Sequence, residues 1–110
     1  MRSFHTSVTD LRQGYSETIE TLGYECGWAG EAIFFVTAED ATPTDAVIDL
    51  EVQLSADGIR WLDEGSTLRL TGPSAGFIRL SHFGGFLRLR GTVGGAARRC
   101  LLTIRLALKE

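Results

Sequence analysis

The stretch Ile48-Asp49-Leu50-Glu51-Val52-Gln53-Leu54, within residues 45–54, decides the fold expected of this chain. Every second residue in it is apolar, and polar residues occupy the positions between. Successive side chains of a β-strand point to opposite faces of the sheet, so this period of two predicts a strand with one buried and one polar face. A helix would instead place the acids among the apolar residues. We therefore expect Leu50 and Val52 to lie in the core.

The same alternation recurs along the chain. Its longest instance, residues 99–109, predicts one apolar face made of Cys100, Leu102, Ile104, Leu106 and Leu108. Shorter instances occupy residues 68–70, 78–80 and 87–89. Upstream, Tyr15–Glu25 and Glu31–Ala38 are also rich in strand-forming residues. The second holds the unbroken run Ala32-Ile33-Phe34-Phe35-Val36, which predicts a strand covered on both faces.

Turn signals separate these segments: Asp57-Gly58, Gly72-Pro73-Ser74, Gly84-Gly85, Gly94-Gly95 and a polar turn around Pro43. About eight or nine short strands, spaced about ten residues apart, are typical of an antiparallel β-sandwich or barrel. The one helical candidate is a short turn near Thr9–Gln13. We predict an all-β fold: a single antiparallel, jelly-roll-like β-sandwich over residues 1–110.

Size and composition fit one domain. The chain has 110 residues, of which 44% are hydrophobic and 23% charged, so a core can form and disorder is not expected. No apolar run approaches the roughly 20 residues of a membrane span. The start Met1-Arg2-Ser3-Phe4 lacks the apolar stretch of a signal peptide, which predicts cytoplasmic synthesis. Cys26 and Cys100 have no metal-site spacing; a disulfide between them is not readable from sequence, and buried, reduced thiols are favoured.

Charge is unevenly distributed between the halves of the chain. Residues 1–55 carry two cations and ten acids, a net −8, whereas residues 56–110 carry nine cations and four acids, a net +5; together they give −3. Ten of the eleven cations are arginine, which suits ordered contacts better than lysine does. Either the halves neutralise each other within one domain, or a bipolar particle meets its own copies or a differently charged partner.

Six arginines alternate with apolar residues along the predicted strands: Arg69, Arg79, Arg88, Arg90, Arg99 and Arg105. If these strands share a sheet, its outer face carries a guanidinium patch. We treat the six as candidate protein-contact residues, with Asp49 and Glu51 as the acidic side of the contact, against the alternative of a merely solvated face. Nucleic acid is disfavoured, because the chain is net negative, has one lysine and does not interleave aromatics with these arginines.

Catalytic and metal-binding patterns are missing from the sequence. His5 and His82 are the only histidines, no nucleophile elbow is present, and the acids alternate outward along strands. There is no calcium loop, no zinc motif and no phosphate-binding glycine loop. We therefore expect no enzyme, no cofactor and no metal.

Three aromatic residues in or near turns are candidates for ligand binding. Trp28 lies in Gly27-Trp28-Ala29-Gly30, and Phe83 and Phe86 flank the diglycine at 84–85. Such residues either stack on a ligand or close the open ends of a sandwich. They are the candidate ligand-stacking residues.

One local string resembles a known hairpin. Ser55-x-Asp57-Gly58-x-x-Trp61 places a turn glycine between two strands, with Ser55 and Asp57 able to cap turn amides and Trp61 packing on the sheet. It is similar to the S-x-D-G-x-x-W hairpin of jelly-roll and β-sandwich modules, which include discoidin-type carbohydrate- or lipid-binding domains and small sandwich proteins of phage and prophage particles. The resemblance covers nine residues, 53–61, and supports the fold more than any activity.

Two functions follow as hypotheses. The first is a non-catalytic structural or assembly protein that works through protein–protein contacts, such as an accessory or decoration subunit of a phage-like particle, with a homo-oligomer or another assembly protein as partner and the virion as its location. The second is a carbohydrate-binding jelly roll. A binding module should show a concave, aromatic-lined pocket with convergent polar groups, whereas an assembly subunit should show flat contact surfaces.

Overall fold

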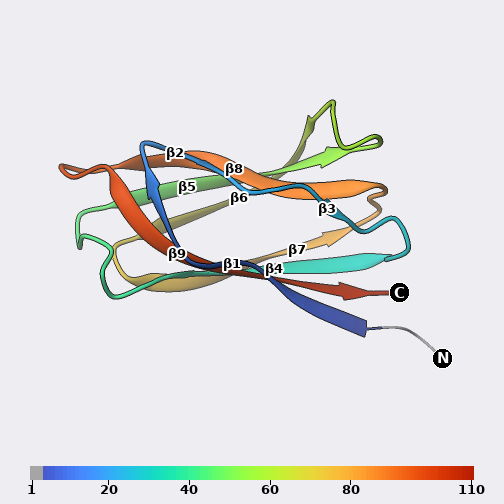
Figure 1. Ribbon diagram of the computed structural model, residues 1–110, viewed down its shortest axis with the longest axis horizontal. Coiled ribbons are helices and arrows are strands. Elements are labelled where there is room, and N and C mark those ends of the chain that lie inside the picture. Colours follow the sequence, from blue (N-terminus) through green and yellow to red (C-terminus); the bar gives the residue numbers. More distant parts are fainter. Residues whose placement is uncertain (1–3) are drawn as a thin grey trace.

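The computed structural model describes residues 4–110, which form nine β-strands in two antiparallel sheets packed face to face (Figure 1). The strands are β1 (Phe4–Ser16), β2 (Thr18–Glu20), β3 (Tyr24–Glu25), β4 (Glu31–Ala38), β5 (Val47–Ser55), β6 (Leu62–Thr71), β7 (Ser74–Ser81), β8 (Phe86–Gly94) and β9 (Arg99–Lys109). The expectation drawn from the start of the sequence, Met1–Ser3, lies outside the described residues.

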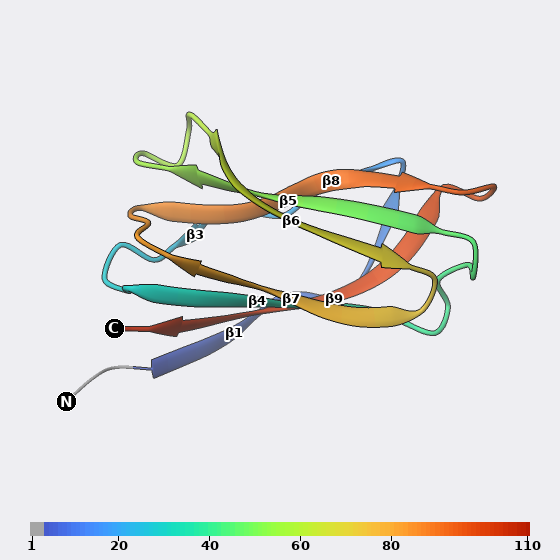
Figure 2. The same ribbon diagram turned by 180° about the vertical axis from the view of Figure 1, so that it is seen from behind.

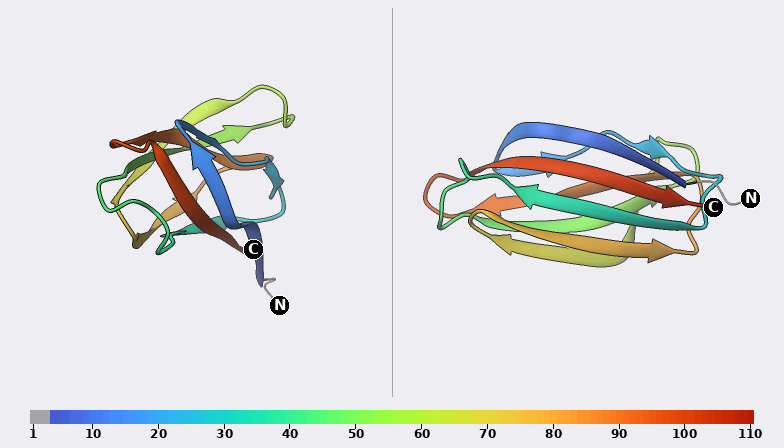
Figure 3. Two further views of the ribbon diagram at one scale, coloured as in Figure 1. Left: turned by 60° about the vertical axis from the view of Figure 1, so that its left-hand side comes forward. Right: turned by 90° about the horizontal axis from the view of Figure 1, so that it is seen from below.

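Sheet A has the strand order β1-β9-β4-β7, and sheet B has the order β2-β8-β5-β6, with β3 also paired to β8. Figure 2 shows the two layers from behind, and Figure 3 shows the molecule obliquely and from below. Because β2 and β3 both run along β8, they act as one interrupted edge strand. The eight strands that result are ordered as in a jelly roll, two four-stranded sheets wound from Greek keys. The predicted all-β, jelly-roll-like sandwich is confirmed.

The core lies between the two sheets and is built by the alternation seen in the sequence. In β5 and β9 every second side chain is buried, and Leu50, Val52, Ile104 and Leu106 are at most 2% exposed. These four residues were expected in the core, and the structure confirms them. Both cysteines are also buried as expected, and neither takes part in a disulfide.

The short helical turn expected near Thr9–Gln13 is wrong. These residues belong to β1, which bends through two register shifts against β9, between Val8 and Asp10 and between Asp10 and Gln13. Arg12 takes a left-handed conformation, φ 47°, and its amide donates to Thr103 Oγ1 at 3.1 Å. Extra residues in a bulge disturb the period of two. The sequence of a bulged strand can therefore resemble that of a turn over a few residues.

The single strand expected over Tyr15–Glu25 is divided in the structure. β1 ends at Ser16, Glu17 has φ 63°, and the chain then crosses to sheet B as β2. The Glu17 amide donates to the Arg98 carbonyl at 2.9 Å, and the Val93 amide donates to the Glu17 carbonyl at 2.9 Å. These bonds fix the corner at which the chain leaves one sheet for the other. Sequence periodicity alone does not reveal such a corner.

The hairpin between β5 and β6 has the internal bonds expected of its sequence. Ser55 Oγ accepts from the Gly58 amide at 2.8 Å, and Asp57 Oδ1 accepts from the amides of Ile59 and Arg60 at 2.8 and 2.9 Å. Gly58 has φ 79°, the left-handed region that glycine adopts without strain. Accepting these amide bonds lowers the pKa of Asp57. The turn is therefore held by its own side chains.

Candidate interaction surfaces

The outer face of sheet B neutralises its charges within the chain. Arg69 and Asp49 stand opposite each other on β6 and β5, and Arg69 Nε donates to Asp49 Oδ1 at 2.6 Å. Arg90 on β8 stands opposite Glu51 on β5. The acids and arginines that the sequence suggested for two sides of a contact are therefore neighbours on one face. This arrangement matches the alternative in which the two halves of the chain neutralise each other.

Arg88 is the most enclosed arginine of this face. Its Nε donates to Gln53 Oε1 at 2.8 Å, and its Nη1 lies 3.1 Å from Glu20 Oε1. The guanidinium also sits over the ring of Trp61, 4.3 Å from the centroid. Trp61 is thus half-buried against the outside of sheet B, where its ring also lies beside Gly23, and not in the core. With three partners inside the chain, Arg88 supports the local structure of the sheet.

The six candidate arginines do not share a sheet. Arg69, Arg88 and Arg90 lie in sheet B, whereas Arg79, Arg99 and Arg105 lie in β7 and β9 of sheet A. The single guanidinium patch is therefore corrected to two groups of three. Alternation assigns a residue to an outer face but does not say which sheet its strand joins. Within residues 4–110, none of the three sheet A arginines takes part in an ion pair.

The outer face of sheet A carries large apolar side chains. Register pairs Val8 with Arg105, Arg105 with Phe35, and Phe35 with Phe77, which sets these residues in one row across all four strands. Phe35 is 43% exposed and Phe77 51% exposed. We name this surface the apolar face; its residues are Phe4, Val8, Ile33, Phe35 and Phe77. Figure 3 shows its four strands side by side in the view from below.

A groove of about 370 Å³ runs over the apolar face, between Phe4, Ile33, Arg79 and Lys109. The Arg79 guanidinium lies 5.2 Å from the centroid of the Phe77 ring. The run Ala32–Val36 was expected to be covered on both faces, and within this chain that is wrong. Its even-numbered residues are in the core, but Phe35 is open to solvent. Among residues 4–110, Ile33 on the second face is half-buried and Phe35 stays exposed, so this face is only partly covered.

The candidate stacking residues lie around one end of the sandwich but do not form one platform. The loop that holds Trp28 meets the loop at 82–85, because the Cys26 amide donates to the Gly85 carbonyl at 2.8 Å. Phe83 is partly buried against the core, and Phe86 packs over Gly58 in the hairpin loop. Trp28 alone of the three is largely exposed, at 42%.

A cleft of about 720 Å³ opens beside Trp28, at the end where both ends of the described chain lie. His5 from β1 and Tyr24 from β3 face each other in it, with Glu25 and Glu110 as acidic members of its lining. We name this hollow the end cleft. The sequence drew attention to Trp28 only, because its partners come from distant strands that no spacing pattern connects.

Neither cysteine is placed for chemistry. Burial raises the pKa of both thiols, Cys26 and Cys100, to about 11, which keeps them protonated at neutral pH. In the part of the chain that the structure describes, no three His, Cys, Asp or Glu side chains gather as a metal site. The described residues also form no helix long and apolar enough to cross a membrane.

The comparisons with known proteins show the fold. The sequence matches no protein-family model and no curated protein. Among solved structures, the chain is similar to the SPBc2 prophage-derived protein YomS, with TM-score 0.64 and 7% identity over 100% of this chain and 96% of that one. It is also similar to the PBSX exported protein XepA, with TM-score 0.60 and 9% identity over 98% of this chain.

A third similar structure comes from infectious bursal disease virus, Gx strain, with TM-score 0.63 and 10% identity over 99% of this chain. This chain spans 36% of XepA and 33% of the viral chain, so the match covers about a third of each of those longer chains. At these identities the likeness is one of fold: a jelly-roll sandwich of the kind found in prophage-derived and viral proteins.

Proposed function

We propose that this chain is a non-catalytic structural subunit that assembles with copies of itself through the apolar face of sheet A. The observation that carries the proposal is the exposure of Phe35 and Phe77, side by side on that face and beside arginines that make no ion pair within residues 4–110. A sheet face that stays in water usually carries polar side chains. Aromatic residues with arginine are instead the composition enriched at protein interfaces.

A second copy is the occupant that we propose for this face. Lys109 and Arg79 stand toward one end, where Glu31 is the register partner of Lys109, and Glu39 and Asp40 stand at the other end, where both pair with Arg12. The Glu39 carboxylate lies on this outer surface, since it accepts from the Thr103 hydroxyl. A two-fold axis running across the strands would set Lys109 and Arg79 of one copy over Glu39 and Asp40 of the other. It would also pack the phenylalanines of both copies together, as in an isologous dimer.

The size of the face is adequate for such a contact. Four strands about 4.8 Å apart, each about eight residues long at about 3.3 Å per residue, cover roughly 500 Å² of plane. Side-chain relief raises the accessible area above that value, toward the roughly 800 Å² per partner of a standard interface. The apolar centre supplies most of the affinity, and the charged ends fix the orientation, because exposed ion pairs are worth about 0–1 kcal/mol each.

The likeness to YomS, XepA and a viral protein supports a place for this dimer in a phage-like particle, as an accessory or decoration subunit. In this proposal the chain is made in the cytoplasm and works in the assembled particle, with other copies of itself as partners. Assembly through flat sheet faces requires no cofactor and no catalytic residue.

Light scattering after size exclusion tests this proposal. Phe35→Ser with Phe77→Ser should convert the assembled protein to monomer, because the variant loses the apolar centre of the contact. The matched control is Ile59→Ser, which removes a still more exposed apolar side chain, 80% exposed, from the β5–β6 loop. The control should keep the assembled mass. Equal masses for both variants would count against the apolar face.

Charge reversal tests the orientation. Lys109→Glu alone should weaken assembly, because it would meet the acidic end of the second copy. Adding Asp40→Lys to the same chain should restore it at low salt, since the two substituted side chains then carry opposite charges and face each other across the contact. If the double variant assembles no better than the single one, the two-fold arrangement is wrong even if the apolar face is the contact.

A further inference from the structure

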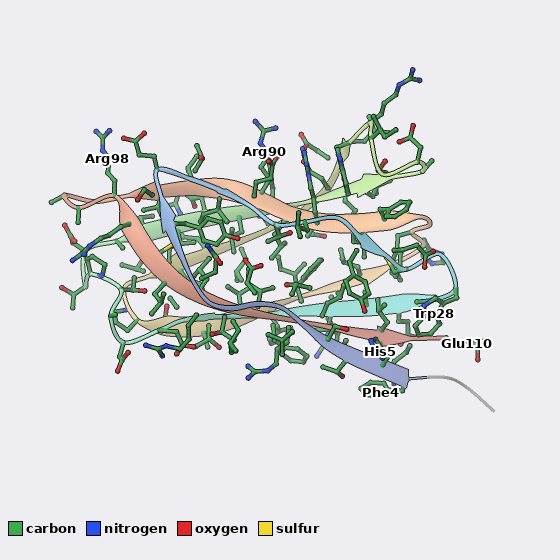
Figure 4. The ribbon with its side chains drawn as sticks, viewed as in Figure 1. Phe4, His5, Trp28, Arg90, Arg98 and Glu110 are labelled. Carbon is green, nitrogen blue, oxygen red and sulfur yellow. The ribbon has the colours of Figure 1, made fainter. Side chains whose placement is uncertain are left out.

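The end cleft is a shallow hollow that is open to solvent, and it differs from the face of sheet A in combining the aromatic residues Tyr24 and Trp28 with several polar groups. Its lining consists of His5, Gly23, Tyr24, Glu25, Trp28 and Glu110. Figure 4 labels three of them, His5, Trp28 and Glu110, which lie together at the end where β1 begins and β9 ends. The lining comes from both sheets and from the β3–β4 loop. Polar groups that converge on an exposed aromatic ring are one feature of small-ligand sites.

Two polar side chains of the cleft wall, His5 and Tyr24, are held in a hydrogen-bond network with Ser7 behind them. His5 Nε2 lies 2.7 Å from Ser7 Oγ and 3.1 Å from Tyr24 Oη, and the two hydroxyl oxygens lie 2.6 Å apart. His5 and Ser7 belong to β1, whereas Tyr24 belongs to β3, so the network joins the two sheets. Hydroxyl groups both donate and accept, and a neutral imidazole does so as well. The wall can therefore exchange hydrogen bonds with a ligand rich in hydroxyl groups.

Glu25 and Trp28 form the other side of the cleft. The Gly27 amide donates to Glu25 Oε1 at 2.9 Å, which fixes the direction of the carboxylate. Trp28 is 42% exposed, so part of its indole is available as an apolar surface. The cleft thus offers a flat ring, an oriented carboxylate and a hydroxyl–imidazole network around one volume of about 720 Å³.

We infer that the end cleft binds a saccharide, with the apolar side of a pyranose ring on Trp28 and its hydroxyl groups against His5 and Tyr24. A sugar has one apolar side and a rim of groups that donate and accept hydrogen bonds, which is the complement of this lining. The oriented carboxylate of Glu25 favours a protonated amino sugar over a neutral one. This site is independent of the assembly face, since none of its lining residues belongs to the apolar face.

Calorimetric titration with three tetrasaccharides tests the inference on the full chain. The probes are a β-1,4-linked glucosamine tetramer, its fully N-acetylated form and the corresponding glucose tetramer. The amino tetramer should bind most tightly. Trp28→Ala should weaken that binding about tenfold or more, the equivalent of losing one good stacking contact. Glu25→Gln should bring the affinity for the amino and acetylated tetramers within about twofold of each other.

The controls separate recognition from charge and from misfolding. Asp40→Asn removes an exposed acid far from the cleft, and Phe77→Ser changes the assembly face; both should leave saccharide binding unchanged. Trp61→Phe leaves Trp28 as the only tryptophan, whose emission should shift to the blue when the amino tetramer binds. This readout requires no variant of the cleft itself.

Three results would overturn the inference. One is the absence of heat and of any emission shift with every tetramer at millimolar concentration. Another is equal binding of a lysine tetrapeptide, which would show attraction of any cation. The third is unchanged affinity in Trp28→Ala that remains folded by circular dichroism.

Discussion

Phe35 and Phe77 pair in register on neighbouring strands of sheet A, with ring centroids 6.4 Å apart and planes tilted by 43°. Both rings are about half exposed, and Arg79 extends over the Phe77 ring. Tilted aromatic pairs at this distance attract each other, but pairing on an open surface hides only part of each ring from water. A partner that covers both rings would gain the remaining hydrophobic free energy, which is why this pair defines the proposed contact.

The core should respond strongly to truncation. Ile104→Ala removes a completely buried side chain from the centre of β9 and should lower the free energy of unfolding by about 2–5 kcal/mol. Leu62→Ala, at a position that is 68% exposed on β6, should change it by less than about 0.5 kcal/mol. Urea unfolding followed by circular dichroism measures both. Similar losses for the two variants would contradict the assignment of inner and outer faces.

Two adjacent glycines provide a matched test of the loop between β7 and β8. Gly85 has φ 80°, and a Cβ there would lie 2.2 Å from the Ser55 carbonyl oxygen, whereas a Cβ at Gly84 meets nothing within 4 Å. Gly85→Ala should therefore destabilise the fold by about 1–3 kcal/mol or more, and Gly84→Ala should be close to neutral. The melting temperatures of the two variants measure these effects. A larger loss of stability for Gly84→Ala than for Gly85→Ala would mean that the loop has a different backbone conformation.

The β5–β6 hairpin should show an acid-dependent contribution from Asp57. The pKa of this carboxyl lies below its ordinary value of 3.8 in the folded chain, because the carboxylate accepts the Ile59 and Arg60 amides. A lowered folded-state pKa means that the stabilisation is fully present above the ordinary value of 3.8 and is lost as the pH falls through the folded-state pKa. Asp57→Ala should thus lower the melting temperature more at pH 7 than at pH 2. A pH-independent difference would contradict this role.

Alkaline pH should weaken the fold through its buried acids. The pKa of Cys26 and of Cys100 is raised from 9.0 to about 11 by burial, and that of Tyr15 is raised by burial and by its bond to Asp10. Their stabilising contribution is complete below pH 9 and declines as the pH rises toward 11. The melting temperature should fall over that range, and less steeply in Cys100→Ala. Equal slopes for variant and wild type would contradict a buried, protonated Cys100.

Much of the fold could be predicted from the sequence because most strands alternate apolar and polar residues with a period of two. β4 has the predicted bounds Glu31–Ala38, and β9 begins at the predicted Arg99 and buries the predicted face. The errors lie where geometry departs from simple alternation, at the bulges of β1 and at the Glu17 corner. Both depend on backbone bonds to residues about 90 positions away, such as Arg12 to Thr103, which local patterns do not contain.

The functional surfaces could be predicted only in part. The unbroken run around Phe35 did carry a signal, because it has two apolar faces, and one chain covers only one of them. The end cleft gave no comparable signal apart from Trp28, since His5 and Tyr24 meet only when β1 and β3 come together. The alternation of arginines with apolar residues correctly predicted that these side chains point away from the core. It could not predict which of the two sheets each strand joins, because that depends on pairing between strands far apart in the sequence.

Sedimentation equilibrium of the wild-type chain over a range of concentrations tests the assembly claim most directly. The mass should rise from 12.0 kDa toward twice that value or a larger even multiple, because the apolar face pairs two copies. The association should be strong enough to persist at high salt, since apolar burial contributes most of it, while the salt-sensitive part should be small. A mass that stays at 12.0 kDa at every concentration and salt tested would contradict assembly through sheet A.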